Sequence, residues 1–349
     1  MLLCLVPLLL LFVHFFEYDR QSHGISGDFD VGLIGQLSGV ESGGELFFVV
    51  NRTSMYEQPR GPRSDQVHLL LVHGYGEHCG RMAYQRLASM LAQTTASSPG
   101  IVVHCVDLPG HGYTAAIKTR GNLHHAEAAN RAVRGILPPS FDVLVDTVRA
   151  ALREIEAALP PTGTHKVILA GHSLGGLIAV HTLASYRGKV DGLLLSSPAL
   201  LIDPATTPPP AITSFLRYVV APLAPTLPVT SLSLHHLTSN VTEAQSYEQD
   251  PLVYAGGIPA RTAKLVLAAT EAAPAALAAL PSSLPLYHFH GDDDKIASVG
   301  ATDIMSRWFS GHPTILRIPR GRHELLTESG WQDIVKGIRD WIDTIQVAG

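Results

Sequence analysis

The 349-residue chain has few of the features that mark nucleic-acid-binding, metal-binding or disulfide-stabilised proteins. It has 25 lysines and arginines against 30 acidic residues, and it lacks a run of basic residues, which argues against nucleic acid as a partner. Its three cysteines form no Cys-x-x-Cys pair, so their spacing implies no disulfide framework, and Cys105 is expected to be a core residue of an apolar strand. His124-His125 and His235-His236 have no cysteine or carboxylate partners at metal spacing, so no metal or other cofactor is predicted.

The apolar run at the N-terminus is shorter than the roughly 20 residues that cross a bilayer as a helix. It extends from Leu2 to Phe16, has no basic region before it and is followed by no small-residue cleavage site. We interpret residues 1–20 as an uncleaved signal-anchor or a membrane anchor, with a cleaved secretory signal as the alternative. The expected location is therefore at a membrane, most readily an endomembrane, or else outside the cell.

The most informative stretch of the sequence is Val167 to Ser185. A short β-branched apolar run enters a serine bracketed by glycines, and an apolar segment at helical spacing leaves it. This pattern is typical of a G-x-S-x-G nucleophile elbow, whose tight turn needs small neighbours and exposes the serine hydroxyl above a sheet. Ser173 is therefore the predicted nucleophile, although the pentapeptide alone also fits a glycine-rich strand-to-helix turn.

Two other predicted strands end in loops that suit an active site. Val67 to His73 is a continuous apolar run that leads into Gly74-Tyr75-Gly76, and such a loop can present a backbone N–H to an oxyanion. We predict that the oxyanion hole consists of the backbone N–H groups of Tyr75 and Leu174. The loop from Asp107 to Tyr113 follows another predicted strand and is expected to border the site in a structural role.

An acidic loop and then a histidine loop follow the last two predicted strands. The first contains the triplet Asp292 to Asp294, and the second contains His323. With Ser173 they give the chain order Ser…Asp…His, in which the histidine serves as general base and the aspartate orients it. Spacing alone does not choose among the three aspartates.

The segment between the elbow half of the chain and the acidic loop has a different character. Residues 204–230 are rich in proline around the apolar stretch Ile212 to Val220, which no parallel sheet requires. We predict a cap inserted over the strand ends, whose exposed apolar surface would suit an apolar substrate. A packed helical excursion without a gating role is the alternative.

Seven segments together resemble the monoacylglycerol lipase family of serine hydrolases, over about residues 45–345. The His-Gly-x-Gly-Glu-His and Gly-His-Ser-x-Gly-Gly pieces are specific in combination. The matching segments are His73 to Arg81, Asp107 to Gly112, Gly171 to Gly176, Ser196 to Pro198, Gln249 to Leu252, Gly291 to Ile296 and Arg322 to Leu326.

The resemblance implies hydrolysis of a monoacylglycerol to glycerol and a fatty acid through an acyl-enzyme on Ser173, without a metal. It places the catalytic acid on Asp294, immediately before Lys295, and keeps His323 as the base. It also implies that the glycerol end of the pocket is shaped by four substrate-binding residues: Glu77, Arg81, His172 and Tyr247.

The expected fold class is α/β: an α/β-hydrolase fold with a mostly parallel, doubly wound sheet, helices on both faces and an inserted cap. Glu45 to Asn51 is expected to form an edge strand. The predicted organisation is an N-terminal anchor at 1–20, a linker at 21–40, core at 41–200, cap at 201–260, and core carrying the acid and histidine at 261–349.

The alternatives to a monoacylglycerol lipase are a lysophospholipase or broader carboxylesterase, and, outside enzymes, a catalytically inactive lipid-binding module. The expected partners are a lipid ester substrate and a membrane surface. The sequence departs from the family pattern in the apolar N-terminus, the long 115–136 loop, the bulky Tyr75, and Ala297, where some members have cysteine. These departures bear on which head group is bound more than on the hydrolytic chemistry. The sequence leaves acyl-chain length and oligomeric state open.

Overall fold

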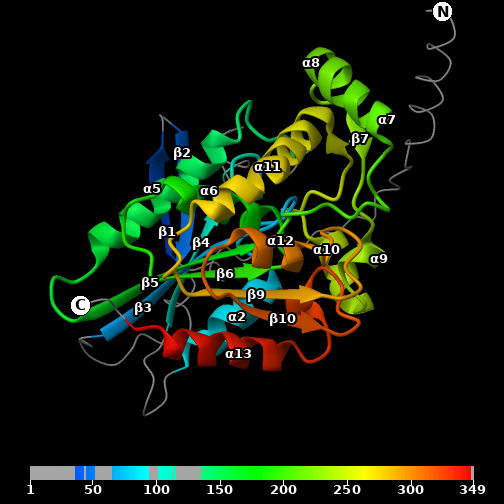
Figure 1. Cartoon of the computed structure of the whole chain (residues 1–349). Coiled ribbons are helices and arrows are strands. Elements are labelled where there is room, and N and C mark those ends of the chain that lie inside the picture. Colours follow the sequence, from blue (N-terminus) through cyan, green and yellow to red (C-terminus); the bar gives the residue numbers. More distant parts are fainter. Residues whose placement is uncertain are drawn as a thin grey trace, which may run out of the picture. The chain divides into compact units, whose positions relative to one another are not determined.

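The computed structural model describes residues 36–42, 45–51, 65–93, 101–112, 114 and 135–346 (Figure 1). All of them belong to one compact unit, which spans Ile34–Gly349. The predicted N-terminal segment 1–20 and most of the predicted insertion at 115–136 lie outside the described residues.

An eight-stranded sheet forms the centre of this unit, with the strand order β1-β2-β4-β3-β5-β6-β9-β10. The six strands from β4 to β10 in this order are parallel, whereas β1 and β2 pair antiparallel and β2 joins β4 antiparallel. The predicted mostly parallel sheet is therefore confirmed. Its strands are β1 (Gln36–Ser42), β2 (Glu45–Asn51), β3 (Asp65–Val72), β4 (Ile101–Asp107), β5 (Thr164–His172), β6 (Gly192–Ser196), β9 (Leu286–Gly291) and β10 (Thr314–Ile318).

Helices cover both faces of the sheet, as expected for a doubly wound fold (Figure 1). On one face, α5 (Asp142–Ala158), α6 (Leu174–Ser185), α11 (Ala260–Ala278) and α12 (Ala301–Trp308) pack into one apolar cluster. On the other face, α2 (Met82–Ala92) and α13 (Trp331–Thr344) pack into a second. Helix α6 is buried on nearly all sides, which explains why its sequence is apolar throughout, whereas α13 buries a single stripe.

The first two strands differ from the expectation. Glu45–Asn51 forms β2, but it is not an edge strand, because Gln36–Ser42 pairs along its whole length as β1. The predicted linker therefore overlaps a strand by five residues. The Gly43-Gly44 dipeptide between the two runs is a hairpin signal that favours this pairing over a linker.

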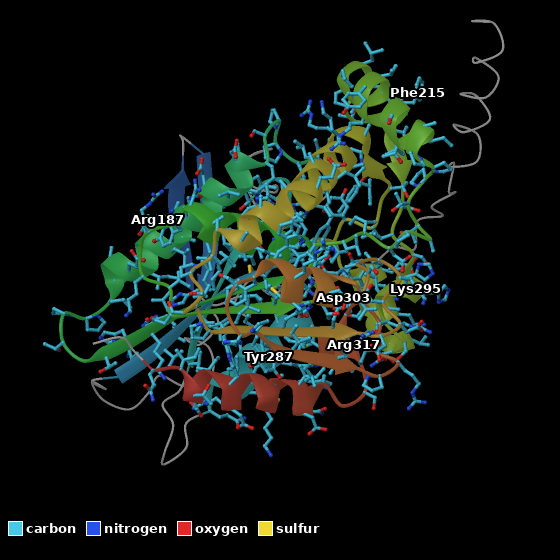
Figure 2. All side chains as sticks on the ribbon, viewed as in Figure 1. Arg187, Phe215, Tyr287, Lys295, Asp303 and Arg317 are labelled. Carbon is cyan, nitrogen blue, oxygen red and sulfur yellow. A yellow bond between two sulfur atoms is a disulfide. The ribbon has the colours of Figure 1, made fainter. Side chains whose placement is uncertain are left out.

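Between β6 and β9 the chain leaves the sheet for a long excursion, whose first helices lie at the top of Figure 1. Before α11 it contains a nearly continuous helical stretch whose large apolar side chains are exposed, including Ile212, Phe215, Tyr218, Val219 and Leu223; Figure 2 labels Phe215 there. Its elements are α7 (Pro210–Phe215), the π-helix η5 (Leu216–Val220), α8 (Ala221–Leu223), β7 (Pro228–Thr230), α9 (Leu234–Leu237), α10 (Val241–Gln249) and β8 (Ile258–Pro259).

The expected location at a membrane needs correction. Within the residues that the structure describes, no helix is both long enough and apolar enough to cross a membrane. The apolar segment on which the expectation rested, residues 1–20, is not among them.

A disulfide joins Cys79 to Cys105, which the cysteine spacing did not predict. Cys79 lies in the loop after β3, and Cys105 lies on β4, whose pairing with β3 brings the two Cα atoms to 5.6 Å. Both side chains are fully buried, so the prediction that Cys105 is a core residue is confirmed while its partner was missed. Cysteines 26 residues apart become neighbours only through strand pairing, which the spacing alone does not show.

We expect reduction of this disulfide, or a Cys105→Ser substitution, to lower the free energy of unfolding by about 3–4 kcal/mol, because closing a loop of this length restricts the unfolded chain. Urea unfolding with and without reductant measures the change. Under denaturing, non-reducing conditions one free thiol should titrate, from Cys4. Three free thiols would contradict the disulfide.

Candidate active site

The turn after β5 gives Ser173 a strained backbone. Its φ of 51° and ψ of −117° lie outside the regions that L-residues ordinarily occupy. The strain is possible because the flanking glycines leave room: a Cβ on Gly171 would lie 2.4 Å from the Gly175 carbonyl oxygen, and one on Gly175 would lie 2.1 Å from that of Val72. The strand–turn–helix predicted from the sequence is present, and Ser173 stands at the N-terminus of α6.

Two backbone N–H groups that line the same cavity as Ser173 have no acceptor among the described residues. They belong to Tyr75, in the loop after β3, and to Leu174, the first residue of α6, and neither donates to any atom of the described residues. Tyr75, Leu174 and Ser173 all line the same cavity. Free N–H groups at a helix N-terminus suit a developing oxyanion, so the two predicted donors are in position for that role.

His323 and Asp294 form a buried pair. Nδ1 of His323 lies 2.7 Å from Oδ2 of Asp294, and both side chains are almost fully buried. The other oxygen, Oδ1, accepts the backbone N–H groups of Ile296 and Ala297 at 2.9 and 3.0 Å. Burial raises the pKa of Asp294, but the charge of His323 and the hydrogen bonds to the carboxylate outweigh it, so the pKa lies well below its usual value.

The other two aspartates of the triplet face away from this pair. Asp292 pairs with Arg317 at 2.9 Å and Asp293 pairs with Lys295 at 3.0 Å, and both carboxylates are exposed. Their partners Lys295 and Arg317, both labelled in Figure 2, are exposed as well. Of the three candidate acids, Asp294 is therefore the one that contacts the histidine.

A ring contact places the histidine loop beside the elbow. The ring centroids of His323 and His172 are 4.9 Å apart, and His172 immediately precedes Ser173 in the chain. Loops from the ends of β3, β5, β9 and β10 thus converge at the carboxyl edge of the sheet, where open α/β sheets bind their ligands.

A cavity of about 170 Å³ opens from Ser173 under the excursion. Its lining is mainly apolar, and nearly half of the lining residues come from η5, β7, β8 and α11. Representative lining residues are Leu216, Val229, Leu232, Ile258, Val266 and Leu267. The arrangement can hold an apolar chain with one end at the serine hydroxyl.

On the other side of the elbow lies a buried ionic cluster, composed of Glu77, Arg81, His172 and Glu324. Nη1 of Arg81 donates to Oε1 of Glu77 and, at 3.0 Å, to Oε2 of Glu324. Nε2 of His172 lies 3.3 Å from Oε1 of Glu324, at ion-pair distance but without hydrogen-bond alignment. The ring of Tyr247 lies under the guanidinium, 4.7 Å from Cζ of Arg81 to its centroid.

The structure thus brings the four predicted head-group residues together, but among the described residues they do not line the cavity. They approach Ser173 through Gly74, whose Cβ position would lie within 3.3 Å of Glu77, His172 and Ser173. The sequence reasoning missed Glu324 as a member, and the signal that could have found it is its position directly after His323. Glu77, His172 and Glu324 offer ligand atoms within 4.8 Å of one another, but Arg81 already supplies the cation between the two carboxylates.

The carboxylates of the cluster have opposed pKa shifts. Burial raises the pKa of Glu77 to about 7, with Glu324 adding to the rise and Arg81 opposing it. Burial also raises the pKa of Glu324, but Arg81 and His172 outweigh it, so that pKa lies well below its ordinary value. Burial lowers the pKa of His172, and Glu324 more than offsets this. The pKa values of two adjacent buried carboxylates move apart in this way because the repulsion between two negative charges disfavours the state in which both are ionised.

The raised pKa of Glu77 predicts a pH-dependent effect of Glu77→Gln. Since the folded-state pKa of about 7 exceeds the ordinary 4.5, the contribution of Glu77 to stability is fully present below pH 4.5 and is lost as the pH rises through 7. The free energy of unfolding of Glu77→Gln minus that of wild type should therefore rise by on the order of 3 kcal/mol between pH 4.5 and pH 8, because only wild type loses this contribution. Urea unfolding at several pH values measures this. The exposed Glu154→Gln serves as control, and a pH-independent difference for Glu77→Gln would contradict the shift.

Comparison with known proteins identifies the family. Residues 64–330 match the family model described as serine aminopeptidase, S33. The chain belongs to the serine aminopeptidase S33 family. It is similar to the monoacylglycerol lipase of Mycolicibacterium smegmatis, with 27% identity across 78% of this chain and 87% of that protein. It is also similar to the phospholipase YtpA of Bacillus subtilis, with 28% identity across 79% of this chain and 94% of that protein.

The fold is shared with solved structures as well. The crystal structure of the Paleococcus ferrophilus monoacylglycerol lipase superposes with a TM-score of 0.64 at 24% identity, covering 85% of this chain and 98% of that one. The resemblance to monoacylglycerol lipases drawn from the motifs is confirmed, and the chain has the α/β-hydrolase fold. This member of the S33 family is a serine hydrolase of the lipase and esterase type, acting on esters.

Proposed function

We propose that the protein hydrolyses monoacylglycerols to glycerol and a fatty acid through an acyl-enzyme on Ser173. The observation that carries the proposal is that Ser173 and two N–H donors with no acceptor among the described residues line an apolar cavity beside the buried Asp294–His323 pair. The ring contact of His323 with His172 brings that pair next to the elbow. All three members of a Ser-His-Asp triad are present, which disfavours the inactive lipid-binding module.

The proposed mechanism assigns each group one task. His323 removes the proton from Ser173 as the hydroxyl attacks the ester carbonyl, and Asp294 holds the ring and stabilises its cation. The N–H groups of Tyr75 and Leu174 hold the oxyanion. His323 then protonates the leaving glycerol oxygen, and water, deprotonated by the same histidine, releases the fatty acid.

The cavity supports a fatty acyl chain as the acid part of the ester. Its lining is mainly apolar, and much of it comes from the excursion between β6 and β9. We propose that residues 201–260 of this excursion act as a lid over the cavity. The exposed apolar side chains of α7, η5 and α8 are consistent with an element that meets an apolar substrate.

The ionic cluster supports an uncharged head group. The guanidinium of Arg81 is already shared by Glu77 and Glu324, so it is not available to neutralise a phosphate. A glycerol hydroxyl, in contrast, can both donate to a carboxylate and accept from a cation. We propose that Glu77, Arg81, His172 and Tyr247 form the polar end of the site.

A lysophospholipase is the second candidate, and one observation favours it. Lys264 lines the cavity, and its ammonium group could meet a phosphate; Arg217, the other cation of the lining, is paired with Glu271 in a bidentate contact at 2.6 and 2.9 Å. The similarity to a bacterial phospholipase points the same way.

A substrate panel tests the choice: monoolein, lysophosphatidylcholine and p-nitrophenyl butyrate, each with wild type and Lys264→Met. We expect kcat/KM for monoolein to exceed that for the other two by at least about tenfold, and Lys264→Met to leave the order unchanged. A preference for lysophosphatidylcholine that Lys264→Met abolishes would overturn the monoacylglycerol proposal in favour of the second candidate.

A further inference from the structure

Two buried histidines of β9 have no task in the mechanism above. His288 and His290 are both completely inaccessible to solvent. The strand alternation directs Tyr287 and Phe289 into the apolar cluster with α2 and α13, so the two histidines face the opposite side of the sheet. Burying an imidazole away from water is costly unless its nitrogens are hydrogen-bonded, so their contacts indicate their role.

The proton of His290 is assigned by what surrounds it. Nε2 of His290 lies 2.9 Å from the carbonyl oxygen of Ala297 and 3.2 Å from Oδ2 of Asp294. Both neighbours are acceptors only, since Asp294 is held as a carboxylate, so Nε2 carries the proton. The atom Oδ2 is the same one that contacts Nδ1 of His323.

His290 therefore contacts both the catalytic acid and the backbone segment that holds this acid. Its Nε2–H donates to the carbonyl oxygen of Ala297 and lies 3.2 Å from Oδ2 of Asp294, at ion-pair distance. The N–H of Ala297 donates to Oδ1 of Asp294 at 3.0 Å. With its two oxygens contacted from different sides, the carboxylate cannot rotate away from His323 without losing one of these contacts.

His288 stands behind His290 and supports the same tautomer. Nε2 of His288 lies 3.2 Å from Nδ1 of His290. Burial lowers the pKa of His288 to about 3, so His288 carries a single proton. A proton on Nδ1 of His288 would have no acceptor among the described residues, so Nε2 carries it and donates to Nδ1 of His290. Nδ1 of His288 is then a bare lone pair, and it is buried without a partner among the described residues. The reverse tautomer would bury an unsatisfied N–H there instead, which is unfavourable.

We propose that His290 is a positioning residue for the catalytic acid: its Nε2–H holds Asp294 in the orientation that His323 requires, and His288 fixes the tautomer that allows this. The inference rests on the proposed function, in which Asp294 is the acid. Partners that orient a metal ligand in this indirect way are typically worth 10–100-fold in activity, and we expect a similar factor for a partner that orients a catalytic carboxylate.

The test compares His290→Met, which fills a similar volume without a donor, with His290→Gln, which keeps an N–H donor. The matched control is His165→Met, another buried histidine whose Nε2 contacts a carbonyl oxygen (Thr162, 3.0 Å), but at the start of β5. We expect His290→Met to lower kcat about 10–100-fold with KM nearly unchanged. His290→Gln should restore most of the loss, and His165→Met should behave as wild type.

The pH profile of kcat/KM separates positioning from simple packing. Without the donor, Oδ2 of Asp294 keeps more negative charge for His323, so the acid limb should move to higher pH in His290→Met but not in His165→Met. In Asp294→Asn, adding His290→Met should cause little further loss, because His290 acts through that carboxylate. Wild-type kcat together with an unmoved acid limb in His290→Met would overturn the proposal.

A measurement on the wild-type protein does not depend on whether a variant folds. The ¹⁵N chemical shifts of His290 should show the proton on Nε2 and a bare Nδ1; a proton on Nδ1 alone would overturn the proposal. The two failures are distinguishable. Wild type that turns over no ester in the substrate panel would defeat the proposed function, whereas active wild type with His290→Met equal to His165→Met would defeat this inference alone.

Discussion

Replacing Ser173 by alanine is expected to lower kcat for ester hydrolysis by about 10⁶-fold and to abolish covalent labelling by a fluorophosphonate. The loss should be this large because members of a triad act as a unit, and removing the serine leaves the donors of the oxyanion hole and substrate binding only. Since the strained turn depends on the glycines around Ser173 and not on its hydroxyl, the variant should fold normally. Fluorescent labelling and monoolein hydrolysis in parallel measure both effects.

The matched control is Ser185→Ala, at the exposed end of the same helix, where the hydroxyl contacts Arg149. It should label and turn over as wild type does. If Ser173→Ala keeps its activity, another group is the nucleophile and the elbow is only a structural turn. Folded wild type that neither labels nor hydrolyses any ester would favour the inactive lipid-binding module.

The sequence was sufficient for the parts of the fold that depend on short stretches. The apolar run into Ser173 and the helix after it correspond to β5 and α6 within a few residues, because a buried parallel strand and a buried helix both require continuous apolar sequence. The loops after β9 and β10 were placed correctly for the same reason, since each follows an apolar run at the edge where parallel strands end.

What the sequence did not predict depends on pairings between distant residues. Cys79 meets Cys105 only because β3 pairs with β4, and Glu324 joins Glu77 and Arg81 only because loops from opposite ends of the chain converge. In the sequence His290 cannot be distinguished from an ordinary strand residue, because its contact with Asp294 is seen only in the folded structure. None of these contacts leaves a spacing or periodicity in the sequence.

The histidine loop is tied to the excursion as well as to the sheet. Nη1 of Arg322 donates to the carbonyl oxygens of His235 and Thr238, at 2.7 and 3.0 Å, around the end of α9. The backbone N–H of Glu324 donates to the carbonyl of Leu237 at 2.7 Å. The residues on both sides of His323 are therefore held at α9 and its C-terminal end, so any movement of that helix acts on the position of His323.

Replacing Asp294 by asparagine is expected to lower kcat by about 10⁴-fold with little change in KM. The amide can present its NH₂ to Nδ1 of His323, which favours the tautomer that has its proton on the wrong nitrogen, and it cannot stabilise the imidazolium. The buried environment increases the effect, because no solvent is available to replace the lost charge. Steady-state kinetics with monoolein measure the loss, and circular dichroism checks that the variant folds.

The acidic triplet supplies its own controls. Asp292→Asn and Asp293→Asn make the same chemical change one or two residues away, in carboxylates that pair with Arg317 and Lys295 at the surface. Exposed ion pairs contribute about 0–1 kcal/mol, so both variants should keep wild-type kcat and stability. A 10⁴-fold loss in Asp294→Asn alone would assign the acid to the one carboxylate of the three that is buried against His323. An equal loss in Asp293→Asn would instead show that the acidic loop adopts another arrangement during catalysis.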